Sequence, residues 1–134
     1  MTFYERKLKK LHEVLYKNQV QIDAVIAIRK YIDCNYEIDL NLNLLSQIQF
    51  ISKYHLLRLF KKYYGLTPRQ YLIDKRIEKS KDHLVNKMTV TETCYAVGFA
   101  SLGSFSVLFK TKTGKTPVQF QKEQLSRSNL VSDS

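Results

Sequence analysis

Apolar side chains recur at helical spacing along several stretches of the chain, and the clearest of these is residues 52–65. Its apolar positions follow the i, i+3, i+4, i+7 spacing of one helix face: Leu56, Leu59, Phe60 and Tyr63. The opposite face is mostly polar or basic: Lys53, Tyr54, Leu57, Arg58 and Lys61. Because Ser52 suits an N-cap and Gly65 suits the left-handed residue that ends a helix, the pattern predicts a short helix here.

The first third of the chain predicts two helices. Residues 2–17 carry one apolar stripe: Tyr4, Leu8, Leu11 and Leu15. A second helix is expected from Asp23, as its cap, to about Tyr36. We weigh two roles for the first helix: packing on the domain, which we favour, and pairing with a partner or with a second copy.

A short helix is expected just before the Ser52 helix. It runs from Leu42 to Ile48 with Asn41 as its cap, and residues 49–51 make the turn that follows. Two helices joined by a turn of three or four residues, the second with a basic outer face, are typical of a helix-turn-helix. This arrangement makes the Ser52 helix a candidate recognition helix for DNA.

Thr67 and Pro68 open a long helix that is expected to reach about Val85. Its inward positions are predicted to be Tyr71, Leu72, Lys75 (through its methylene stem), Ile77 and Leu84. The solvated side is expected to carry Arg76, Lys79 and Lys81. With no glycine or proline inside it, this helix is predicted to be a rigid spacer between two units.

The last third of the chain predicts a second pair of short helices. Thr89 and Glu92 form a capping box that opens a helix to about Val97, and Gly98 with Phe99 makes the turn. Ser101 caps the next helix, which Gly114 ends. A final helix is expected after Thr116 and Pro117, followed by a frayed polar tail from Ser126.

An internal repeat joins the two halves. A shift of 49 residues superposes eight identities: Ser52 on Ser101, Leu59 on Leu108, Phe60 on Phe109, Lys61 on Lys110, Gly65 on Gly114, Thr67 on Thr116, Pro68 on Pro117 and Gln70 on Gln119. Caps, core positions and helix ends recur in phase, which generic amphipathic helices would not produce. Two such units can enter successive major-groove segments, roughly 34 Å apart.

Charge supports a polyanionic partner. The net charge is +10 with a pI near 9.6, which fits nucleic acid, an acidic membrane or merely surplus lysine. The distribution of acidic residues along the chain helps to distinguish these three readings of the charge. No carboxylate lies between Leu40 and Ile73 or between Thr93 and Lys122. Because phosphates repel carboxylates, the two acid-free tracts indicate two DNA contact faces.

The sequence gives little support for a membrane protein, a secreted protein or an enzyme. Without a signal peptide or an apolar run of membrane-spanning length, we expect a soluble cytoplasmic protein. Cys34 and Cys94 are expected to be buried reduced thiols. No metal spacing, phosphate loop or catalytic pair is apparent, so we predict neither enzyme activity nor cofactor. The remaining alternative is a basic helical scaffold or interaction module without specific DNA binding.

Two motifs resemble a known family. Leu56-Leu57-Arg58-Leu59-Phe60-Lys61 is followed by Gly65-x-Thr67-Pro68-x-x-Tyr71, and Gly98-Phe99 by Phe105, Phe109-Lys110 and Gly114-x-Thr116-Pro117-x-x-Phe120. They are similar to the DNA-binding domain of AraC/XylS-type transcription regulators, over roughly residues 23–122. The resemblance implies a seven-helix, two-lobed all-α fold with a linker helix. It also implies operator binding near promoters, usually to activate through contact with RNA polymerase.

Carried over by position, the base-reading residues of the first lobe fall on Lys53, Tyr54, Leu57 and Arg58. The full candidate DNA-binding set is Ser52, Lys53, Tyr54, Leu57, Arg58, Lys61, Lys62, Ser101, Leu102, Gly103, Ser104, Ser106, Val107, Lys110 and Lys112. The second lobe departs from the family, with Val107 where an arginine is frequent. We therefore hypothesise that the first lobe supplies most of the sequence discrimination and the second adds affinity.

Three further departures concern local geometry: Phe50 stands where a turn glycine is common, Thr93 where an aliphatic is expected, and Gln121 where an arginine often follows. The expected organisation is an arm at 1–22, a first lobe at 23–66, a linker helix at 67–86, a second lobe at 87–125 and a flexible tail at 126–134. We expect residues 1–22 to be too short for a sensor domain, so that control would lie in the expression level or in a sensor on another chain or outside this sequence. Dimerisation through residues 1–22 is one expected role.

Overall fold

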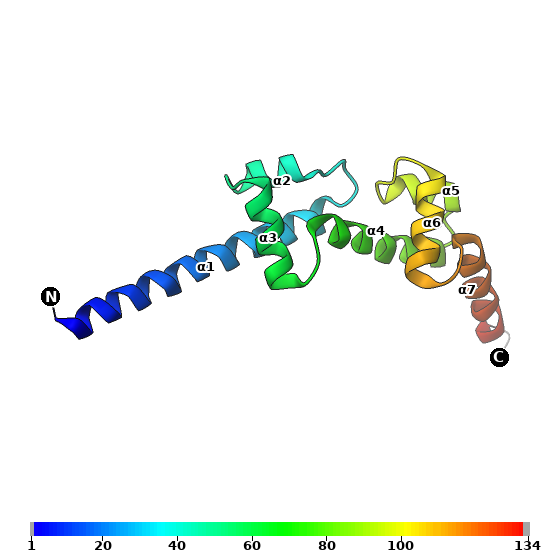
Figure 1. Cartoon of the computed structure of the whole chain (residues 1–134). Helices are drawn as coiled ribbons and strands as arrows, with labels where there is room; N and C mark the ends of the chain where they lie inside the picture. Colours follow the sequence, from blue (N-terminus) through cyan, green and yellow to red (C-terminus); the bar gives the residue numbers. More distant parts are fainter. Residues whose placement is uncertain (1, 133–134) are drawn as a thin grey trace. The chain divides into compact units, whose positions relative to one another are not determined.

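The fold of the protein comes from a computed structural model that describes residues 2–132 (Figure 1). Within this range the chain forms helices and no strand: α1 (Phe3–Asn35), α2 (Leu42–Ile48), α3 (Lys53–Tyr64), α4 (Pro68–Val85), α5 (Val90–Ala96), α6 (Leu102–Thr113) and α7 (Pro117–Ser132). None of these helices is long and apolar enough to cross a membrane. The predicted all-α class is confirmed.

The chain divides into two compact units. The first contains the residues up to Cys34 together with Asn41–Pro68, and the second contains Asn35–Leu40 together with the residues from Arg69 onward. Each unit holds one short helix pair joined by a tight turn, α2 with α3 and α5 with α6. The expected division into arm, lobe, linker, lobe and tail remains a prediction.

The N-terminal region is one helix, not the two that were predicted. α1 continues from Phe3 to Asn35, and Asp23 lies inside it instead of capping a second helix. The Asp23 carboxylate accepts a hydrogen bond from the Gln19 amide at 2.9 Å, four residues earlier on the same helix. Because residues 18–22 contain neither glycine nor proline, nothing in their chemistry interrupts the helix.

The core of the first unit lies on the C-terminal half of α1. Its buried side chains come from three helices: Val25, Ile28, Ile32, Leu45, Leu56, Leu59 and Phe60. α3 lies against α1, since the Tyr63 hydroxyl donates to the Gln21 side chain at 3.4 Å and the Arg29 guanidinium sits 6.0 Å from the Tyr64 ring. Burial of the predicted stripe on α3 leaves its opposite face outside the core.

The earlier part of α1 does not pack on the domain, contrary to the role that we favoured. Its large apolar side chains are about half exposed or more: Phe3, Tyr4, Leu8, Leu11, Val14, Leu15, Tyr16 and Val20. We call residues 3–20 the arm. None of these side chains belongs to the buried core of the described residues, so the arm is helical without packing into that core.

Aromatic rings fill the core of the second unit. Its buried cluster is Ile77, Leu84, Cys94, Val97, Phe99, Phe105 and Phe109. Phe105 lies 5.2 Å from Phe99 and 5.7 Å from Phe109, and Phe109 lies 5.5 Å from Phe120 of α7. Edge-on and tilted ring pairs at these distances are favourable beyond their burial. The cluster fixes α6 between α5 and α7.

Arg76 does not lie on the solvated side of α4, in contrast to the expectation from the sequence. It is half-buried, and its guanidinium donates to the carbonyls of Tyr36 at 2.7 Å and Ile38 at 2.8 Å while stacking 5.6 Å from the Phe99 ring. Burial lowers the pKa of Arg76, against the opposing effect of Asp39. The arginine thus ties the segment after α1 to the second unit.

Two smaller expectations also need correction. Cys34 is exposed, whereas Cys94 is buried as predicted. α7 continues to Ser132, so residues 126–132 of the predicted tail are helical, and residues 133–134 lie outside the described part of the chain. The helix gains one long-range anchor near its start, since the Gln121 amide donates to the carbonyls of Leu84 and Met88 at 3.2 and 2.6 Å.

Candidate nucleic-acid interface

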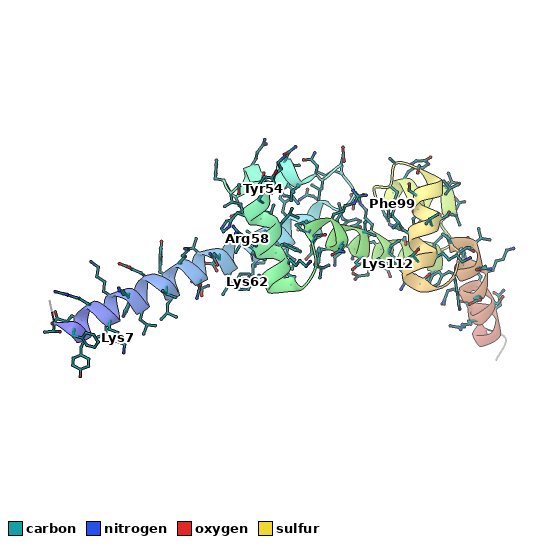
Figure 2. The ribbon with its side chains drawn as sticks, in the orientation of Figure 1. Lys7, Tyr54, Arg58, Lys62, Phe99 and Lys112 are labelled. Atoms are coloured by element: carbon teal, nitrogen blue, oxygen red, sulfur yellow. The ribbon has the colours of Figure 1, made fainter. Side chains whose placement is uncertain are left out.

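The outer face of α3 is the most cationic of the candidate surfaces. Ser52 caps the helix by accepting the His55 N–H at 3.1 Å, and Gly65 ends it at a φ of 77°. Figure 2 shows Tyr54, Arg58 and Lys62 along this helix. Of the predicted contact residues on α3, all are exposed except the half-buried Leu57: Lys53, Tyr54, Leu57, Arg58, Lys61 and Lys62.

Arg58 is oriented by its own helix. Its guanidinium lies 3.3 Å from Nδ1 of His55, one turn earlier, and can donate to it when the imidazole is neutral with its proton on Nε2. This contact directs the guanidinium along the exposed face and leaves further N–H donors available. A planar fork of donors on an acid-free helix suits a guanine edge or a phosphate.

The outer face of α6 is chemically different. Ser101 caps the helix by accepting the Ser104 N–H at 3.2 Å, and Gly114 ends it at a φ of 84°. The candidate residues on this face are small or apolar and exposed, apart from the half-buried Ser106: Leu102, Gly103, Ser104, Ser106 and Val107. Two hydroxyls and two aliphatic side chains offer weak polar contacts and contacts to thymine methyl groups.

The lysines at the end of α6 differ in their surroundings. Lys110 is exposed, whereas Lys112 forms an ion pair with Asp74 of α4 at 2.9 Å. Both members of that pair are partly solvated, so the interaction contributes little to stability. It nevertheless neutralises part of the charge that Lys112 was expected to offer to a phosphate.

The two short turns have the same backbone motif. In the first, Phe50 N–H bonds to the Gln47 carbonyl and Ile51 N–H to the Ser46 carbonyl; in the second, Gly98 bonds to Tyr95 and Phe99 to Cys94. These are the paired bonds of a Schellman motif, which requires a left-handed residue after the helix. Phe50 fills that position at a φ of 54° and Gly98 at 103°.

The second turn is one residue longer, which the uniform shift of 49 concealed. Before the turn the two units correspond at a shift of 48, which pairs the caps Asn41 and Thr89 and the two left-handed residues. After the turn the shift is 49, from Ser52 and Ser101 onward. Thr93 therefore corresponds to the buried Leu45, and its hydroxyl is satisfied by the Thr89 carbonyl at 2.8 Å.

Metal-binding side chains do not cluster among the described residues. No group of three or more histidine, cysteine or acidic side chains there could hold a metal ion. Burial raises the pKa of the Cys94 thiol, which keeps it protonated and unreactive. His55 is the histidine at the candidate face, and its partner in the structure is Arg58.

Comparisons with known proteins agree with this geometry. A family model described as a helix-turn-helix domain matches residues 45–123. An uncharacterised HTH-type transcriptional regulator in the cgkA 5′ region of Pseudoalteromonas carrageenovora is 35% identical over 118 residues, which cover 88% of this chain and 68% of that protein. The chain spans 35% to 46% of the length of three further curated relatives.

Two solved structures share the fold. The C-terminal domain of the two-component response regulator yesN from Fusobacterium nucleatum is 31% identical, with a TM-score of 0.70 over 74% of this chain and 98% of that one. The DNA-binding domain of AdpA, solved in complex with a target DNA, has a TM-score of 0.74 at 19% identity and covers 77% of this chain and 94% of that one.

Paired capped helix-turn-helix units, each presenting an exposed face on its second helix, define the class as a two-unit DNA-binding domain. The chain belongs to the AraC/XylS-type helix-turn-helix family of transcription regulators. The predicted family, fold and regulator class are confirmed, and the scaffold alternative is not favoured. Membership of this family points away from an enzyme.

Proposed function

We propose that the chain binds operator DNA through α3 and α6, each entering one of two adjacent major-groove segments. The observation that carries the proposal is Arg58, a guanidinium oriented by His55 on an exposed, carboxylate-free face. One bidentate contact between an arginine and a guanine contributes roughly 1–3 kcal/mol of discrimination. Exposed lysines on the same helix supply the charge that draws the face toward phosphates.

The two faces have unequal tasks in this proposal. α3 carries the arginine and Tyr54, which can read base edges and thymine methyl groups, so it supplies most of the sequence discrimination. α6 carries Ser104, Val107 and Lys110, which favours general affinity over base selection. The proposed contact residues are those of the candidate set, with Lys112 weakened by its ion pair to Asp74.

Selection of bound sequences from a random DNA pool tests this proposal directly. With the wild-type chain we expect a bipartite site whose first half is the more restricted. Arg58→Ala should relax one or two positions of that half and lower affinity for the selected site about 10-fold or more. Lys9→Ala, on the exposed arm, is the matched control and should leave the selected sequence unchanged.

Operator variants separate the roles of the two helices. Base substitutions in the first half-site should weaken binding by about 1–3 kcal/mol each, and those in the second half-site by clearly less. Equal losses in both halves would overturn the unequal assignment. A pool that yields no preferred sequence would overturn operator binding itself.

The remaining assignments concern partners. We infer that the arm pairs with a second copy of the chain, supported by its exposed apolar stripe. Activation of transcription through contact with RNA polymerase is the expected outcome of operator binding. The chain would act in the cytoplasm, with no catalytic activity.

A further inference from the structure

The side chain of Phe50 lies outside the buried cores of both units. It lies in the turn between α2 and α3 at a φ of 54°, and 96% of its surface is exposed. A left-handed backbone is unfavourable for a residue with a Cβ atom, and burial of the ring does not offset that here. Strain that is retained without a packing gain is typical of positions that serve function.

The corresponding position in the second unit shows what the fold alone requires. Gly98 fills it there, and a Cβ atom would lie 2.8 Å from the carbonyl oxygens of both Tyr36 and Glu37. The second turn thus packs closely against its own unit, and glycine fits there because it has no Cβ atom. In the first unit the same motif projects an aromatic ring into solvent.

The surroundings of Phe50 indicate what the ring would meet. Phe50 precedes the N-cap Ser52 by two residues, so it stands at the end of α3 that also carries Lys53 and the 81% exposed Tyr54. No carboxylate occurs from residue 41 to residue 72. An aromatic ring close in sequence to Lys53, without acidic neighbours in the sequence, fits the edge of a polyanion better than a basic protein surface.

We propose that Phe50 is a specificity-determining residue, which contacts a thymine methyl group at the edge of the segment that α3 reads. The phenyl ring has no hydrogen-bonding group, and the thymine C5 methyl is the apolar feature of base pairs in the major groove. This inference rests on the proposed function of α3 and extends it to a residue outside the helix.

Phe50→Gly gives effects of opposite sign on stability and binding. Glycine removes the left-handed strain, so the thermal midpoint of the chain should rise by about 3 °C. Affinity for the selected operator should fall about 5-fold, the lower range for loss of one base contact. Replacing operator thymines one at a time by deoxyuridine should reveal one position that weakens binding of the wild type but not of Phe50→Gly.

Lys87→Gly is the matched control, because Lys87 also adopts a left-handed backbone (φ 70°) after a helix. It should raise the midpoint similarly without altering the thymine dependence. Unchanged operator affinity in Phe50→Gly overturns the proposal, and if promoter activation is lost at the same time, the ring contacts a protein instead. A loss of affinity that no deoxyuridine position reproduces also overturns it. If Arg58→Ala weakens binding while Phe50→Gly does not, the inference fails and the function of α3 stands.

Discussion

Two glycines that follow helices are required for different physical reasons. Gly98 is needed twice, for its φ of 103° and for the close approach of the Tyr36 and Glu37 carbonyls. Gly114 is needed only for its φ of 84°, since a Cβ atom there would meet nothing within 4 Å. The two glycines therefore separate backbone strain from steric contact.

Alanine substitution should measure that difference. Gly114→Ala is expected to lower the free energy of unfolding by about 1 kcal/mol, through left-handed strain alone. Gly98→Ala should lower it by about 3 kcal/mol, because the added methyl group also displaces backbone. Urea denaturation of the two variants checks this. Equal losses in the free energy of unfolding would show that the backbone of the second turn moves to accommodate the methyl group at no further cost.

At the scale of helices, the N-caps of α2, α3, α5 and α6 were predictable and the long-range anchors were not. Asn41, Ser52, Thr89 and Ser101 were recognised as caps because each bonds to an N–H three residues away, which is local chemistry. Arg76 was missed because its acceptors lie about 40 residues earlier in the chain. One signal was present, since Arg76 and the buried Ser80 follow Leu72 at four-residue steps and so share its inward face.

The arm is the element for which we propose pairing with a second copy of the chain. A seven-residue repeat continues from the arm into the core through the apolar residues Tyr4, Leu11, Val25 and Ile32, with the polar Asn18 at the middle position. Leu8, Leu15 and Ile22 form the second row of the same seam. Arg6, Lys9, Lys10 and Lys17 fall away from the seam, whereas Lys7 borders it.

Leu11→Asp should therefore abolish self-association without unfolding the domain, because a charge in the seam faces its own copy while Leu11 is 52% exposed in the single chain. Tyr16→Asp adds the same charge off the seam and should leave the dimer intact. Sedimentation velocity at tens of micromolar distinguishes the two. A monomeric wild type at that concentration would exclude self-pairing of the arm.

For the molecule as a whole, the distribution of charged residues along the chain was visible in the sequence. Which lysines form ion pairs in the folded chain, and so offer less charge to a phosphate, was not visible. The acid-free tracts contain α3 and α6, and their role as two DNA contact faces remains a prediction. The pairing of Lys112 with Asp74 depended on tertiary structure, because 38 residues separate the two along the chain. The contact roles of individual residues on both faces remain predictions.

Salt dependence tests the proposed faces together. The logarithm of the operator binding constant should fall linearly with the logarithm of salt concentration, with a slope of about −0.9 for each phosphate neutralised. Lys61→Ala should reduce the magnitude of that slope by about 1, whereas Lys9→Ala on the arm should not alter it. Equal changes in both variants would mean that charge acts diffusely and not through α3.

The unbroken course of α1 has a mechanical consequence. The same helix carries the arm at one end and, at the other, the Val25, Ile28 and Ile32 side chains of the core that supports α3. A rotation or displacement imposed on the arm is transmitted along the helix without an intervening hinge. A molecule that bound the arm would therefore be mechanically coupled to the core on which α3 rests.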